Sequence, residues 1–99
     1  FDGLFGAAHA LEIPFTFNTV TRPGVDTFLG PGETPTALAE AMHDAWIAFI
    51  RDGDPSTAAL GDWPRYTPDD RLVMNLDDQC GLLIDPRPAE RSVWEHLIR

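Results

Sequence analysis

Histidine is the side chain best suited to exchanging protons near neutral pH, because its unperturbed pKa is about 6.5. The chain has three histidines, His9, His43 and His96. His9 is followed three residues later by Glu12, and one helical turn would bring that imidazole and carboxylate together. A lone histidine of this kind is most simply a loop residue that hydrogen-bonds the backbone. The functional alternative is a general acid–base catalyst.

The other residues with reactive side chains are most simply structural. We expect His43, inside a predicted helix, to be solvated, and His96 to lie near the end of the last helix, where a positive charge is favourable. Neither has a partner at ligand spacing, so the sequence predicts no metal site. The single cysteine, Cys80, cannot close an intrachain disulfide. We expect it to be a partly buried structural thiol.

The chain is short and strongly acidic. Its 99 residues carry a net charge of −9, and its basic side chains are all arginine. Such a surface repels phosphate backbones and anionic membranes, which argues against nucleic-acid and membrane partners. No apolar run reaches the ~18 residues of a transmembrane helix. An apolar fraction of 43% indicates a folded rather than a disordered chain.

The N-terminal third is expected to consist mainly of loops. Residues 9–12 could form one helical turn that Pro14 ends, because proline lacks an N–H and biases the preceding residue away from helix. Phe15 and Phe17 would then share one side of an extended segment. Proline and glycine recur through residues 18–35, which predicts a long surface loop.

One long helix is predicted at about residues 35–52. Thr34 fits the N-cap position, with Pro35 in the first helical position. Gly53 fits the position just after the helix, where glycine commonly ends it. The apolar stripe of this helix consists of Leu38, Met42, Ala45 and Phe49.

The remaining elements are a short strand at about residues 71–76 and a final helix at about residues 88–98. Residues 82–84 form either a second short strand or a packed corner. We expect packing roles for the large aromatic side chains Trp46, Phe49, Trp63 and Trp94. With so few elements, each apolar stripe has little other apolar surface to pack against. We therefore expect the chain to cover a larger core in a longer protein, or to self-associate.

Residues 6–15 read Gly-Ala-Ala-His-Ala-Leu-Glu-Ile-Pro-Phe. This segment resembles the histidine segment of type-B carboxylesterases, the family that includes p-nitrobenzyl esterases and cholinesterases. The matching positions in it are His9, Glu12, Pro14, Phe15 and Phe17. The order of later motifs also agrees with that family, through Trp46, Phe49 and Gly53-Asp54-Pro55, then Trp63-Pro64 and Tyr66. The resemblance extends over residues 3–76.

The resemblance implies an α/β fold, in which residues 1–99 are the C-terminal portion of an α/β-hydrolase domain and residues 3–17 form its catalytic-histidine loop. It implies cofactor-free hydrolysis of small ester substrates by a Ser-acid-His triad. His9 would be the catalytic histidine, and Glu12 would support it without being the triad acid. The chain has no G-x-S-x-G motif, so the nucleophile would lie in a missing N-terminal part, its main expected partner. We expect the isolated chain to be inactive.

Two other functions are consistent with the same residues. An α/β-hydrolase relative that has lost its nucleophile could act as a binding or adhesion protein. A 99-residue chain could also be a self-contained interaction module, although its few elements argue against independent stability. A G-x-S-x-G motif and a separate acidic residue upstream of Phe1 would favour the esterase.

Overall fold

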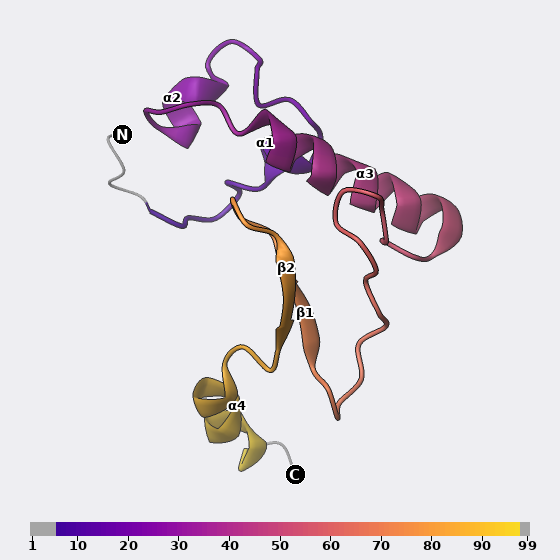
Figure 1. The fold of residues 1–99 in the computed structure, drawn as a ribbon. Coiled ribbons are helices and arrows are strands. Elements are labelled where there is room, and N and C mark those ends of the chain that lie inside the picture. The colour runs from indigo at the N-terminus through magenta and orange to yellow at the C-terminus, as the bar shows by residue number, and fades with distance from the viewer. Residues whose placement is uncertain (1–5, 98–99) are drawn as a thin grey trace.

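The computed structural model describes residues 6–97, and its elements are joined by long connections (Figure 1). In chain order they are α1 (Ile13–Thr16), α2 (Val25–Leu29), α3 (Thr36–Asp52), β1 (Leu72–Asn75), β2 (Gly81–Ile84) and α4 (Pro88–Glu95). Residues 3–5 of the proposed catalytic-histidine loop and residue 98 of the predicted final helix lie outside the described residues.

Pro14 lies inside the first turn of α1, so the prediction that it ends a helical turn was wrong. Proline is tolerated there because the first N–H groups of a helix have no intrahelical acceptor. The predicted extended segment is also wrong, since Phe15 belongs to α1 and Phe17 is its C-cap. The Thr19 amide donates to the Pro14 carbonyl at 2.7 Å and closes this short helix.

The segment predicted as a long loop, residues 18–35, contains the short helix α2. Its five residues, Val-Asp-Thr-Phe-Leu, are free of proline and glycine and lie between Gly24 and Gly30. A stretch of this length is sufficient for a single turn of helix. The glycines on both sides therefore limit the length of α2 but do not prevent this short helix from forming.

The long helix α3 runs over nearly the range expected from the sequence, but it begins differently. Its N-cap is Pro35 rather than Thr34, and the Thr36 amide donates to the Thr34 carbonyl at 2.8 Å. Gly53 ends the helix in the left-handed region at φ 74°, as predicted, and donates to the Phe49 carbonyl at 2.8 Å.

The buried face of α3 is built from small side chains. Its buried residues are Ala39, Ala41, Met42, Ala45 and Ala48. Alanine allows close approach of a neighbouring backbone, and α1 packs along this helix with Pro14 buried (Figure 1). Phe49, expected in the apolar stripe, is instead 51% exposed.

β1 and β2 form an antiparallel hairpin, which confirms the second short strand. Leu72 pairs with Ile84 and Asn75 with Gly81, and Met74 of β1 is buried. Figure 1 shows α4 at the end of the hairpin remote from α3. α4 ends at Glu95, earlier than the sequence suggested, with His96 as its C-cap.

The molecule is elongated, with extents of 47 × 34 × 21 Å and a radius of gyration of 15.9 Å. A compact domain of this length would have a radius of gyration of about 13 Å. The aromatic residues Trp46 and Trp94, expected to be packed, are 51% and 61% exposed. The described residues therefore leave large apolar faces without partners.

Candidate active site

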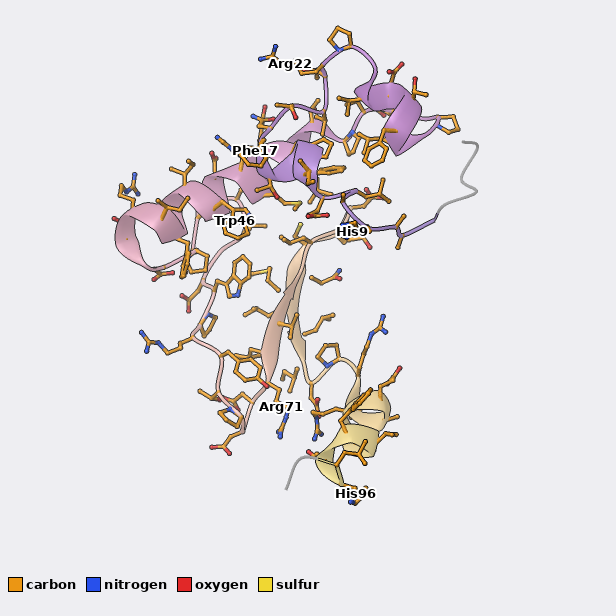
Figure 2. The ribbon with its side chains drawn as sticks, turned by 180° about the vertical axis from the view of Figure 1, so that it is seen from behind. His9, Phe17, Arg22, Trp46, Arg71 and His96 are labelled. Atoms are coloured by element: carbon orange, nitrogen blue, oxygen red, sulfur yellow. The ribbon has the colours of Figure 1, made fainter. Side chains whose placement is uncertain are left out.

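His9 lies on an exposed turn that leads into α1 (Figure 2). The turn is closed by two successive hydrogen bonds, from the Leu11 amide to the Ala8 carbonyl at 3.4 Å and from the Ile13 amide to the Ala10 carbonyl at 3.3 Å. Ala10 adopts φ 70°, which costs an L-residue about 1 kcal/mol. Strained non-glycine residues concentrate at functional sites, where surrounding structure enforces them.

A side-chain contact from α3 fixes the far end of α1. The Nδ1 atom of His43 lies 2.9 Å from the carbonyl oxygen of Thr16, the last residue of α1. A carbonyl oxygen only accepts hydrogen bonds, so Nδ1 must carry the proton that is donated. His43 is partly buried, and the prediction that it is solvated was wrong.

The helical spacing of His43 is consistent with a partly buried position. His43 follows the fully buried Ala39 by four residues and therefore lies on the same face of α3. A polar side chain on a buried helix face needs a hydrogen-bond partner. The sequence alone gave no means of identifying that partner as the backbone of residue 16.

Glu12 is exposed, and among residues 6–97 no hydrogen bond joins its side chain to that of His9. It lines a groove together with Ile13 and Phe17 of the α1 region. Trp46 and Leu76 line the same groove. The two residues singled out from the motif are thus neighbours on one turn without direct contact.

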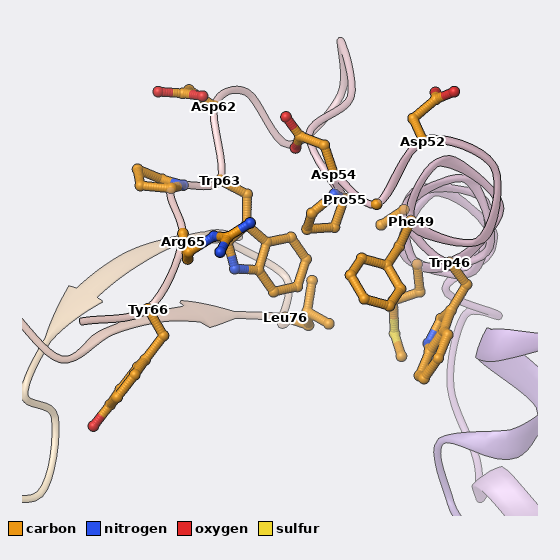
Figure 3. A pocket seen from close by; sticks show the side chains of 14 residues that line it. Trp46, Phe49, Asp52, Asp54, Pro55, Asp62, Trp63, Arg65, Tyr66 and Leu76 are labelled. Atoms are coloured by element: carbon orange, nitrogen blue, oxygen red, sulfur yellow. The ribbon is translucent and has the colours of Figure 1, made fainter. Parts of the chain in front are cut away.

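A larger groove of about 880 Å³ lies between α3 and the segment that leads to β1 (Figure 3). Phe49, Trp63 and Leu76 line it, and Asp52 and Asp54 lie at its rim. His9 is not among its lining residues. The groove continues the exposed apolar face of α3, and its lining residues include no serine, threonine or cysteine.

Neither serine is placed to react with His9. The Ser56 hydroxyl accepts the Trp63 amide at 2.9 Å, and the Ser92 hydroxyl donates to the Ala89 carbonyl at 2.8 Å. Cys80 is exposed, contrary to the expected partial burial, because it lies in the hairpin turn with its Sγ 3.1 Å from the Asp77 carbonyl. The described part of the chain therefore supplies a histidine and no nucleophile beside it.

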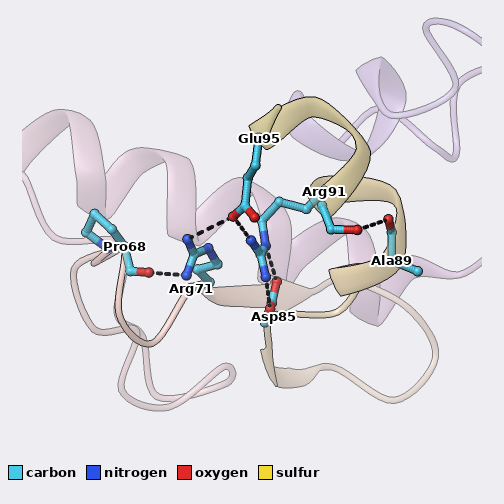
Figure 4. Close-up of polar contacts among 7 residues, drawn as sticks. Pro68, Arg71, Asp85, Ala89, Arg91 and Glu95 are labelled. Carbon is cyan, nitrogen blue, oxygen red and sulfur yellow. Dashed lines mark hydrogen bonds and ion pairs between the residues drawn. The ribbon is translucent and has the colours of Figure 1, made fainter. Parts of the chain in front are cut away.

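The largest ion-pair network among residues 6–97 lies away from His9, at the base of the hairpin (Figures 2 and 4). Arg91 of α4 makes a bidentate contact with Asp85, with Nε–Oδ1 3.0 Å and Nη2–Oδ2 2.8 Å. Arg91 also pairs with Glu95, whose Oε1 lies 3.8 Å from Arg71 Nη2. The hydrogen bonds from Arg91 lower the pKa of the Asp85 carboxyl below its ordinary value. This network attaches α4 to the hairpin.

Residues 6–97 contain no cluster of three or more histidine, cysteine or acidic side chains arranged to hold a metal ion. Within the same range, no helix has both the length and the apolar character needed to cross a membrane.

Comparison with known proteins identifies the family. The model of the carboxylesterase family matches residues 2–94. Phenmedipham hydrolase of Pseudarthrobacter oxydans is 40% identical over 82 residues, which cover 79% of this chain and 16% of that enzyme. Para-nitrobenzyl esterase of Bacillus subtilis (strain 168) is 33% identical over 88 residues, or 87% of this chain and 17% of that enzyme.

Solved structures agree with the sequence comparison. A carboxylesterase from Geobacillus stearothermophilus superposes with a TM-score of 0.76 at 38% identity, covering 89% of this chain and 19% of that one. A structure titled PNB esterase gives a TM-score of 0.73 at 30% identity, covering 85% of this chain and 17% of that one.

The chain belongs to the carboxylesterase family, and its helices and hairpin are part of an α/β-hydrolase fold. The predicted family and fold class are thereby confirmed. The chain spans about one sixth of the length of the curated relatives it matches, 16% and 17% for the two given above. The exposed faces of α3 and the hairpin have no covering element among residues 6–97.

Proposed function

We propose that this chain is part of a serine carboxylesterase and contributes the catalytic histidine, His9. The observation that carries the proposal is the position of His9 in a family-matching motif on an exposed, strained turn, with Ala10 at φ 70° beside it. An exposed imidazole on an otherwise anchored turn is accessible to a serine supplied by another segment. The names of the relatives, which include hydrolases and esterases, support the same reaction class.

In the proposed reaction a serine outside residues 1–99 attacks the ester carbonyl carbon while His9 accepts the hydroxyl proton. The tetrahedral intermediate then expels the alcohol, which receives the same proton from His9. Water attacks the acyl-serine, again losing a proton to His9, and the carboxylic acid is released as the proton returns to the serine. A carboxylate from another segment would orient the ring, and backbone N–H groups would stabilise the oxyanion.

Glu12 is proposed to support the turn rather than to serve as the triad acid. Its exposed carboxylate makes no hydrogen bond to His9 in the described part of the chain, and it borders the apolar groove beside Phe17 and Trp46. In the complete domain a segment covering that groove would bring donors to this carboxylate. Glu12→Gln would then reduce activity far less than removal of His9.

The proposed function is tested by ester hydrolysis with the full-length protein and with residues 1–99 alone. We expect the full-length protein to release p-nitrophenol from p-nitrophenyl acetate and butyrate. We expect the isolated chain to give the buffer rate, because it holds no activated nucleophile. A folded full-length protein that hydrolyses neither ester would favour the non-catalytic binding protein. Hydrolysis by the isolated chain well above its His9→Ala variant would contradict the role assigned to the missing part.

A further inference from the structure

The short helix α1 follows the His9 turn directly, so the position of His9 depends on how α1 is held. α1 contains only four residues, which is too few to be stable by itself. Its tertiary support comes from α3, against which Pro14 is buried. Packing of one proline and small alanine side chains leaves α1 free to slide or rotate unless a directional contact fixes it.

His43 provides such a contact. Carbonyls in the last turn of a helix have no intrahelical donor, and Thr16 is the final residue of α1. Within residues 6–97 no backbone N–H bonds to the Thr16 carbonyl, although the neighbouring carbonyls of Pro14 and Phe15 accept the amides of Thr19 and Asn18. The Nδ1–H of His43 fills this position from α3 at 2.9 Å, across 27 residues of sequence.

We propose that His43 is a positioning residue for the esterase reaction: it caps α1 through the Thr16 carbonyl and thereby fixes the turn that presents His9. This inference rests on the proposed function. His43 does not touch substrate, and its Nδ1 is engaged with the backbone of α1. The property that matters is an N–H donor of the right length at this place on α3, rather than the imidazole as an acid or base.

The test compares His43→Leu with His43→Asn in the full-length protein, since the Asn amide places an N–H donor where the His Nδ1 lies and Leu has a similar shape without a donor. Asp44→Asn, an exposed neighbour on α3, is the control. We expect His43→Leu to lower kcat roughly 10- to 100-fold with KM within about twofold, because a misplaced catalytic group affects the chemical step more than binding. His43→Asn should restore most of kcat, and Asp44→Asn should match the wild type.

Two results with active enzyme would overturn the proposal. One is a folded His43→Leu variant that keeps the wild-type kcat and loses only thermal stability. The other is a His43→Asn variant as impaired as His43→Leu, since that would assign the effect to packing of the ring.

Amide hydrogen exchange over residues 13–19 supplies a readout independent of activity. His43→Leu should exchange faster there than both the wild type and His43→Asn, and equal exchange in all three would contradict the proposed cap. If the wild-type protein hydrolyses no ester, the proposed function fails, and exchange alone decides whether His43 holds α1.

Discussion

The imidazole of His9 is exposed on a turn whose backbone is strained at the next residue, Ala10. That arrangement is useful only if the turn is held in place, and the contacts that hold it come from residues further along the chain. His43 reaches the end of α1, and Pro14 is buried against α3. His43, which is proposed to position His9, thus follows it by about one third of the chain.

The ion pair between Arg91 and Asp85 should contribute to stability in a pH-dependent manner. Because Arg91 lowers the pKa of Asp85, the contribution is present above the ordinary carboxyl pKa of about 3.9. It is lost as the pH falls through the lower pKa of the folded state. Asp85→Asn should therefore lower the thermal unfolding temperature of the full-length protein at pH 7.

The difference between Asp85→Asn and the wild type should shrink as the pH is lowered towards 3. Asp78→Asn is a suitable control, because Asp78 is exposed in the hairpin turn and forms no ion pair among residues 6–97. A difference that stays constant from pH 7 to pH 3 would show that the carboxylate charge of Asp85 is not what stabilises α4.

The sequence was informative about His9 because the relevant pattern is local, a run of ten residues at fixed spacing. It was misleading about His43 because solvation depends on which segment packs over that face of α3. For Cys80 the error was in the opposite direction, because burial was predicted and the side chain is exposed. Free cysteines are commonly buried, but this one lies in a hairpin turn that no other described segment covers. Burial is a property of tertiary packing, which a single sequence does not specify.

Among the elements, α3 was the most predictable because its length, apolar spacing and terminal glycine all agree. The short helices α1 and α2 were not predicted correctly. Pro14 is compatible both with ending one turn and with starting the next, and tertiary packing on α3 selects the second. α2 was missed because surrounding glycine and proline outweighed five residues that can form a turn.

Gly53 ends α3 with φ 74°, and an added Cβ would meet no neighbouring atom there. The effect of Gly53→Ala should therefore arise from the backbone alone, at about 1 kcal/mol of lost stability. Gly81→Ala is the matched control, since its surroundings are equally open and its φ is not in the left-handed region. Thermal unfolding of the full-length protein should distinguish the two, and equal effects would contradict the role of Gly53 as a helix terminator.

At the scale of the whole molecule, the described residues bury few large side chains. The buried apolar residues are mainly alanine and methionine, while Ile50, Ile84 and Leu97 are at least 70% exposed. Large exposed apolar patches mark interaction sites or a tendency to aggregate. This chain matches about one sixth of the length of its relatives. In a protein of that length, other segments would be available to cover these side chains.

Residues 1–99 in isolation should consequently self-associate or melt without cooperativity. A concentration series by light scattering should reveal species larger than the 11.0 kDa monomer. Phe49→Glu with Ile50→Glu should reduce association, because both side chains lie on the exposed part of α3. A stable 11.0 kDa monomer with a cooperative melt would contradict this description of the chain as part of a larger domain.

The role of His9 is tested most directly by p-nitrophenyl butyrate hydrolysis with three full-length proteins: wild type, His9→Ala and His96→Ala. His96 is also an exposed histidine, at the end of α4, and controls for the loss of an imidazole as such. We predict that His9→Ala lowers kcat by at least about 10³-fold, as for removal of a triad member, and that His96→Ala matches the wild type. An active wild type with an equally active, folded His9→Ala variant would contradict the account.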